Sequence, residues 1–147
     1  MYFRENEIYV LASAKNVFGI YKSGEPFFKL MQPVRAEALG EKVLEAIAAF
    51  RQNVPGEYYV RGAKMPLHPF LKFSGFRSWR SFEKSARYFL VTMDDNKVTI
   101  LPSIPYPKGG YAHQPDRSMD CASRPAEIGH TLLQAIQSDG FPENLSR

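Results

Sequence analysis

The stretch EALGEKVLEAI at 37–47 has a close parallel in AEIGHTLLQAI at 126–136. In both segments apolar residues recur at helical spacing, and a glycine stands in the first turn. Glycine in a helix costs about 1 kcal/mol relative to alanine, so two unrelated helices have little reason to share it. Gly40 and Gly129 therefore predict that the start of each helix lies close against neighbouring backbone.

The similarity extends upstream of the two helices. An offset of 89 residues aligns Gly40 with Gly129, and each helix is preceded by a predicted β-hairpin. We interpret the chain as two similar β-hairpin(-β)-α units, at about 5–55 and 78–140, packed as one domain over 1–147. The expected fold class is α+β, with both helices against an antiparallel or mixed sheet. The alternative is that two amphipathic helices have converged on similar residues.

Local patterns assign the individual elements. β-branched and aromatic residues predict strands, and apolar residues at helical spacing predict helices. The expected strands are 7–12, 16–22, 27–31, 57–60, 87–93 and 97–102, and the expected helices are 36–52, 79–86 and 125–138. Polar or turn-forming residues predict breaks at 13–16 and 23–26, a loop that holds Pro66 and Pro69, and an irregular loop from 102 to 115. The Asp-Asp-Asn sequence at 94–96 predicts a compact turn between the strands at 87–93 and 97–102.

Composition excludes several classes of protein. The chain has 147 residues, of which 44% are hydrophobic and 23% charged, as expected for a globular domain. No apolar run approaches the ~20 residues that a membrane span needs. The apolar stretch at 8–12 follows two acidic residues and is too short for a signal peptide, so we expect a cytoplasmic protein. A single cysteine, Cys121, cannot form an internal disulfide.

Several phrases together resemble a known family. A Ser-Trp-x-x-Phe phrase stands at 78–82, and a strand-turn-strand segment ends in Ile-Leu-Pro at 100–102. A helix with Ile-Gly at its start and Ala-Ile at its end follows at 128–136, and 37–47 has the same style. In this order and spacing, over about residues 7–140, the chain resembles the immunity proteins of bacterial contact-dependent growth inhibition (CDI) systems.

The resemblance implies a function without catalysis. Such a protein would lie in the cytoplasm, bind the C-terminal toxin domain of a cognate delivered protein and block its activity by stoichiometric inhibition. Many of these toxins are nucleases. The resemblance implies no enzyme activity and no cofactor or metal, a protein partner, and no membrane association.

Acidic and aromatic residues of the second half are the candidate toxin-binding residues. An inhibitor of a cationic nuclease would offer carboxylates, and exposed tyrosines are favoured at interfaces. The candidates are Asp94, Asp95, Tyr106, Tyr111, His113, Asp116 and Asp120. For the acids the alternative is a solvated turn or face, and for the rings it is packing back over the sheet.

Segment 61–90 supports a second hypothesis. It contains seven lysine or arginine residues against one acid, Glu83, while the whole chain has a net charge of +4. Rings alternate with these cations, so the segment could be a nucleic-acid-binding surface. The alternative, which we favour, is a buried aromatic stripe with solvated polar neighbours.

Two further motifs carry less weight. Cys121 lies close in sequence to His113, Asp116 and Asp120, which invites a thiol-hydrolase hypothesis, but no known signature surrounds it. The three histidines show no metal-ligand spacing.

Overall fold

The computed structural model describes residues 1–56, 66–106 and 110–138. Its eight strands are β1 (Tyr2–Arg4), β2 (Glu7–Asn16), β3 (Tyr21–Met31), β4 (Arg51–Val54), β5 (Arg87–Asp94), β6 (Lys97–Pro105), β7 (Tyr111–His113) and β8 (Met119–Ala122). Its helices are α1 (Ala36–Ala48), α2 (Pro69–Ser74), α3 (Trp79–Glu83) and α4 (Pro125–Ser138), with a 3₁₀ turn, η1, at Pro115–Arg117. None of these helices combines the length and apolar character that crossing a membrane requires.

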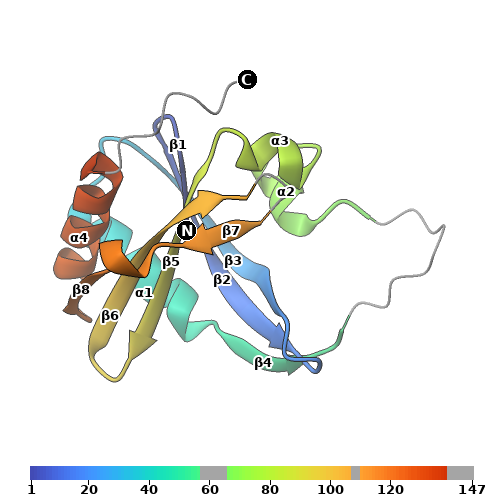
Figure 1. Cartoon of the computed structure of the whole chain (residues 1–147), viewed down its shortest axis with the longest axis horizontal. Helices are drawn as coiled ribbons and strands as arrows, with labels where there is room; N and C mark the ends of the chain where they lie inside the picture. Colours follow the sequence, from blue (N-terminus) through green and yellow to red (C-terminus); the bar gives the residue numbers. More distant parts are fainter. Residues whose placement is uncertain (57–65, 107–109, 139–147) are drawn as a thin grey trace.

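All eight strands belong to one sheet in the order β3-β2-β1-β5-β6-β7 (Figure 1). β8 pairs with β6, and β4 pairs with β2. The pairs are antiparallel except for β2 and β4, which run parallel. The expected α+β class, with helices on a mixed sheet, is therefore confirmed.

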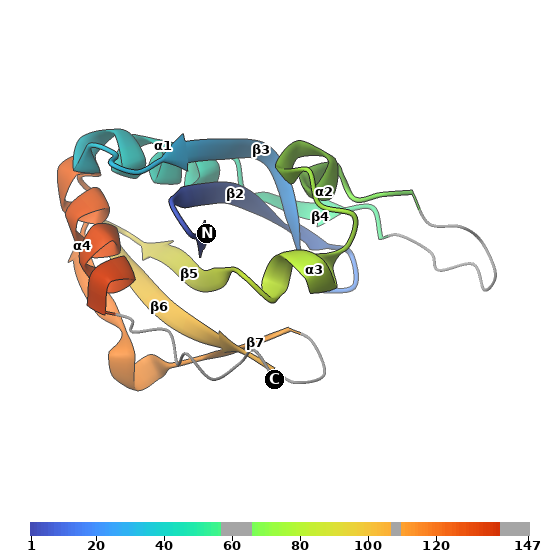
Figure 2. The same ribbon diagram turned by 90° about the horizontal axis from the view of Figure 1, so that it is seen from above.

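Alternation along the strands gives the sheet two apolar faces. Ile8 and Val10 of β2 lie in a core with α1 and α4, whereas Tyr9 between them lies in a second core with α2 and α3. Successive side chains of a strand point to opposite faces, so a single strand serves both cores. Figure 2 shows the two long helices at one end of the molecule and the two short ones at the other.

The two helices α1 and α4 meet through their glycines. A Cβ added to Gly40 would lie 2.7 Å from Pro125 Cα and closer still to the Pro125 carbonyl. A Cβ added to Gly129 would lie 2.7 Å from Ala36 Cα, again with the carbonyl closer. The offset that aligns the glycines also aligns Ala36 with Pro125, so the contact is reciprocal. The predicted close approach of both glycines is confirmed.

The second hairpin and the last helix also follow the prediction. β5 and β6 pair from Tyr88↔Ser103 to Asp94↔Lys97, and Asp95 takes a positive φ of 50° in the turn. α4 begins at Pro125, where a missing backbone N–H has no cost. α3 starts as expected at Trp79 after the Ser78 cap but ends at Glu83 rather than Ala86.

The first hairpin differs from the prediction. The polar residues 13–16, expected to form a break, continue β2, and β3 runs unbroken through the expected turn at 23–26. The reversal occurs at 17–20, where the Asn16 side chain accepts hydrogen bonds from the N–H groups of Phe18 and Ile20. These side-chain hydrogen bonds of Asn16, rather than the polar character of 13–16, set the position of the turn.

Three other predictions were wrong. The helix expected at 36–52 ends at Ala48, and residues from Arg51 form β4 beside β2. The proline-containing segment after 65 includes α2, because Pro69 occupies its first turn and His68 Nδ1 accepts from Phe70 N–H. The 102–115 segment, expected to be irregular, contributes the end of β6 and β7, because both find strand partners. The strand predicted at 57–60 and the chain after 138 lie outside the described residues.

Candidate functional site

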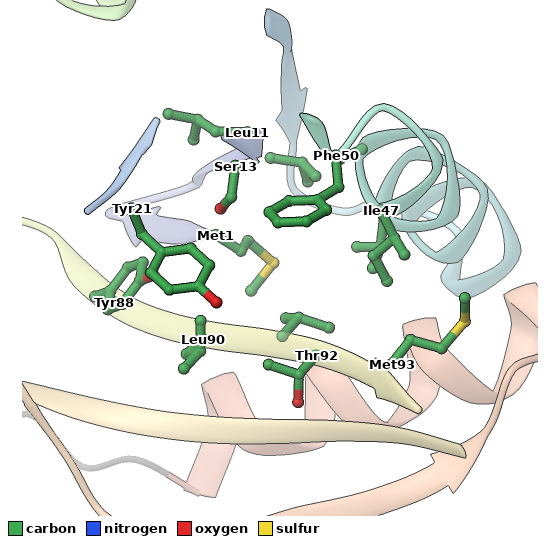
Figure 3. A pocket seen from close by; sticks show the side chains of 14 residues that line it. Met1, Leu11, Ser13, Tyr21, Ile47, Phe50, Tyr88, Leu90, Thr92 and Met93 are labelled. Atoms are coloured by element: carbon green, nitrogen blue, oxygen red, sulfur yellow. The ribbon is translucent and has the colours of Figure 1, made fainter. Parts of the chain in front are cut away.

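An apolar cleft lies where the sheet splits between β2 and β5. β1 lies between these two strands at their starts, and beyond it they diverge, as Figures 1 and 2 both show. β1 fills the space between them for only three residues, with Tyr2 paired to Tyr9 on one side and Tyr88 on the other. The cleft has a volume of about 370 Å³, and Met1 closes its inner end (Figure 3).

Among the described residues, each of the two strands that border the cleft has a stretch of backbone edge without a strand partner. On β2, pairing with β1 stops at Tyr9 and pairing with β4 begins at Ala14, which leaves Val10–Ser13 open on that edge. On β5, Phe89 exchanges hydrogen bonds with Met1, and no strand of the described chain pairs with Leu90–Asp94 on the side away from β6. An open edge of this kind is a template for another extended segment.

The walls of the cleft come from both faces of the sheet. From the α1 side they include Val43, Ala46 and Ile47, and from the opposite side Leu11 and Tyr88. The remaining lining residues are Met1, Val10, Ser13, Tyr21, Phe50, Leu90, Val91, Thr92 and Met93. A segment that entered would therefore meet apolar side chains above and below its own plane.

Two aromatic rings stand at the mouth. Tyr21 of β3 and Phe50, just before β4, stack with their centroids 6.3 Å apart (Figure 3). The two residues are 64% and 38% exposed. Rings that are exposed yet held in a fixed arrangement are suited to act as binding anchors, since little side-chain entropy is lost on contact.

No lining residue is charged, and charges flank the cleft instead. Lys15 lies beside the mouth with its Nζ 5.3 Å from the centre of the Tyr21 ring. Asp94 and Asp95 follow Met93 at the end of β5 and are exposed. Burial raises the pKa of the Tyr88 hydroxyl, so this polar group of the wall is neutral at physiological pH.

The structure separates the sequence candidates along β6 rather than bringing them together. Asp120 lies opposite Thr99, near the β5–β6 turn that carries Asp94 and Asp95. His113 lies opposite Ser103, toward the other end of β6. At about 3.3 Å per residue, four positions of strand separate the two groups by ~13 Å. Of the candidates, Asp94 and Asp95 are those that border the cleft.

The remaining candidates have varied surroundings. Asp116 lies in η1 and is exposed, and Tyr106 is 56% exposed after β6. Asp120 forms an ion pair with Lys97 at 2.7 Å, which, with a hydrogen bond from Thr99, lowers the pKa of its carboxyl.

The ring of Tyr111 packs back over the sheet. It lies 4.9 Å from Tyr88 and 6.0 Å from Tyr2, which was the alternative considered for the loop aromatics. His113 is exposed, and its Nδ1 is 2.8 Å from Ser103 Oγ. The Tyr111 ring therefore packs against the second core.

The surroundings of Cys121 do not favour nucleophilic chemistry. Its position on β8 is opposite Val98, whereas His113 is opposite Ser103, five residues further along β6. Burial is the main reason that the pKa of the thiol is raised. A nucleophilic cysteine needs a lowered pKa and an adjacent base. In the described ranges, no three histidine, cysteine, aspartate or glutamate side chains are grouped to hold a metal.

Comparisons with known proteins add a fold likeness. No protein-family model matches the chain, and no curated protein sequence matches it. A protein of unknown function from Neisseria meningitidis is 17% identical, with a TM-score of 0.69 over 92% of this chain and 90% of the other. A chain of the CdiA-CT/CdiI toxin and immunity complex from Yersinia pseudotuberculosis is 16% identical, with a TM-score of 0.64 over 92% of both chains.

The chain shares the fold of these two proteins. At this level of identity the comparison establishes the architecture over nearly the whole length. One of the two comes from a toxin and immunity complex.

The structure corrects one half of the nucleic-acid hypothesis for segment 61–90. Phe70 and Phe82 are fully buried in the second core, and Trp79 packs against them. The buried aromatic stripe that we favoured is confirmed for Phe70 and Phe82, which are not available for base stacking, whereas Phe73 is 44% exposed. Lys72, Arg77, Arg80 and Lys84 of the same segment are exposed and lie outside this core.

Sequence reasoning missed the cleft residues. Val10, Leu11 and Leu90 belong to strands that were predicted, but nothing in a single strand shows which edge is left open. The one local signal is the shortness of Tyr2–Arg4, a strand of three residues beside the ten of β2. That signal requires knowing that β1 lies between β2 and β5.

Proposed function

We propose that this chain is an immunity protein that binds and neutralises a cognate CDI toxin domain. The observation that carries the proposal is the apolar cleft with two open strand edges between β2 and β5. The likeness to a chain from a toxin and immunity complex supports it, as does the sequence resemblance. Binding would be stoichiometric, in the cytoplasm, and would require no chemistry from the chain itself.

The cleft suggests how a toxin segment is held. Open strand edges favour strand addition, in which main-chain hydrogen bonds supply affinity and side-chain contacts supply specificity. The open part of β2, Val10–Ser13, gives room for about four paired residues, or ~13 Å of extended chain. Alternate side chains of that segment would contact Ile47 on the α1 face and Leu11 on the other.

The acidic residues beside the cleft suggest which kind of toxin surface would be attracted to it. Asp94 and Asp95 are exposed beside the cleft and have no ion-pair partner in the described part of the chain. If the toxin is a nuclease, its substrate-binding surface is cationic, and these carboxylates would speed association by attracting it. The other candidates, Tyr106, Tyr111, His113, Asp116 and Asp120, would lie outside the first contact.

Growth rescue and calorimetry test the proposal. The candidate partner is the C-terminal domain of the protein encoded immediately upstream of the gene, and it is produced with the chain or with its Leu90→Arg variant. Leu90 lines the cleft, so an arginine there blocks it and places a charge against apolar walls. We expect wild type to protect cells and the variant to lose at least about 2 kcal/mol of binding, or roughly 30-fold in affinity.

The control is Glu41→Arg, on the exposed side of α1 away from the cleft. This variant adds a similar side chain without entering the cleft, and we expect it to bind as wild type does. Circular dichroism checks that both variants fold. A toxin that remains active in the presence of the wild-type chain would reject the immunity function, and equal binding by both variants would reject the cleft.

A further inference from the structure

Four exposed cations, called the basic patch below, lie along α2, the link between α2 and α3, α3 itself and its C-cap, on the side of the sheet opposite α1 and α4. They are Lys72, Arg77, Arg80 and Lys84. Arg80 and Lys84 are four residues apart, so they lie on one face of α3, whose opposite face buries Phe82. None of the four lines the cleft between β2 and β5.

The patch is not neutralised by the described part of the protein. Other cations of the chain have carboxylate partners, such as Arg4 with Glu5 at 2.9 Å and Lys29 with Glu7 at 2.5 Å. No residue of the patch forms an ion pair within residues 1–56, 66–106 and 110–138.

The nearest acid in sequence, Glu83, is directed toward the second core. It is half-buried, between the fully buried Phe82 and the exposed Lys84, and burial raises the pKa of its carboxyl. Its charge in turn contributes to the raised pKa of the Tyr2 and Tyr111 hydroxyls, which places it on the tyrosine side of α3. The outer surface therefore keeps its four positive charges.

The structure beneath the patch decides which kind of partner it fits. Phe70, Trp79 and Phe82 are packed in the second core. Phe73, next to Lys72, is 44% exposed, so apart from this one ring the surface offers cations with few apolar anchors. Protein interfaces are depleted in lysine and depend on buried aromatic anchors. Phosphate contacts need only positioned cations, and they supply most of the sequence-independent affinity for nucleic acids.

We infer that this basic patch binds the phosphodiester backbone of a nucleic acid without reading its bases. Binding depends on charge, so it weakens steeply as salt rises, by about 0.9 in the log–log slope for each phosphate contact on duplex DNA. Four cations set a limit of about −3.6 for that slope. This activity would be separate from toxin binding, since it uses different residues.

Fluorescence anisotropy with the full chain tests the inference. The probes are a labelled 20-base-pair DNA duplex and a labelled 20-nucleotide RNA, titrated between 25 and 200 mM salt, with unlabelled polyglutamate as a competing acidic polymer. The variant Arg77→Gln/Arg80→Gln removes two charges from the patch. Lys42→Gln/Lys97→Gln removes two charges elsewhere, from residues that are paired with Glu45 and Asp120.

We expect one or both nucleic acids to bind, and the Arg77→Gln/Arg80→Gln variant to reduce the slope on duplex DNA by about 2. The Lys42→Gln/Lys97→Gln variant should bind as wild type does. The inference is overturned by an absence of binding to both probes at 25 mM salt, or by equal losses in the two variants. It is also overturned if polyglutamate competes as well as unlabelled nucleic acid, because the patch would then fit an acidic protein surface. Toxin binding by the wild-type chain is unaffected by any of these outcomes.

Discussion

Replacing Gly40 with alanine is a direct test of the contact between α1 and α4. The added Cβ would meet the backbone of Pro125 at less than 3 Å, and backbone cannot rotate away as a side chain can. Overpacking of this kind costs about 1–3 kcal/mol. Alanine returns about 1 kcal/mol of helix propensity. A clash with backbone belongs at the upper end of that range, about 3 kcal/mol, so we expect the free energy of unfolding to fall by about 2 kcal/mol.

Thermal unfolding measures this loss. For a chain of this size, 2 kcal/mol corresponds to a fall of roughly 4–8 °C in Tm. Gly129→Ala should behave alike, because its Cβ meets Ala36 in the related position. Both substitutions push the same two helices apart, so the double variant should lose less than the sum of the single losses.

The matched control is Gly24→Ala on β3. A Cβ at Gly24 would lie 3.9 Å from Ala14 Cβ, an ordinary contact, so its Tm should stay within about 2 °C of wild type or rise. If Gly40→Ala proves as stable as wild type, helix propensity outweighs the contact. The close approach would then not explain why the glycine recurs in both helices.

Three further substitutions or reactions have defined outcomes. Hydrogen bonds from Lys29 and Tyr9 lower the pKa of the Glu7 carboxyl. These bonds therefore stabilise the fold fully above the ordinary glutamate pKa of about 4.3, and the stabilisation is lost as the pH falls through the lowered pKa. The Tm gap between wild type and Glu7→Gln should accordingly be largest near pH 7 and close as the pH falls below the lowered pKa of this carboxyl; a gap that is independent of pH would contradict this. Ser78→Ala removes the cap that accepts from a backbone N–H of α3 and should cost about 1 kcal/mol in denaturant unfolding, whereas no change would mean that the cap is dispensable. The Cys121 thiol, with its raised pKa, should react with a disulfide reagent at pH 7 more slowly than free cysteine, and a faster reaction would revive a nucleophilic role.

Local sequence patterns predicted those elements whose signals are complete within a few residues. The turn at Asp94 and Asp95 was recognised because its residue types suit positive φ, and the recurring glycines because their cost in a helix requires a reason. α1 was predicted too long because Phe50 continues its apolar spacing, although the chain has already turned toward β4. Pro69 was taken for a loop signal, although proline is equally at home in a first helical turn.

The candidate site could not be predicted in the same way. The cleft exists because β1 lies between β2 and β5 and then stops, and its pairings join Tyr2 to Tyr9 and to Tyr88, far apart in the sequence. Composition identified a basic and aromatic segment, but only the packing shows that Phe82 is core while Arg80 remains outside. Which residues share an edge or face is a property of the topology.

Hydrogen exchange of the complex tests the central claim most directly, namely that the cleft between β2 and β5 receives the toxin. Backbone amides of Val10–Ser13 and Leu90–Asp94 are followed with and without the toxin domain encoded upstream of the gene. Strand addition predicts that amides on both open edges gain protection on binding, while the outer strand β3 changes little away from the mouth. A stable complex in which neither edge gains protection would contradict the account and place the toxin on another surface.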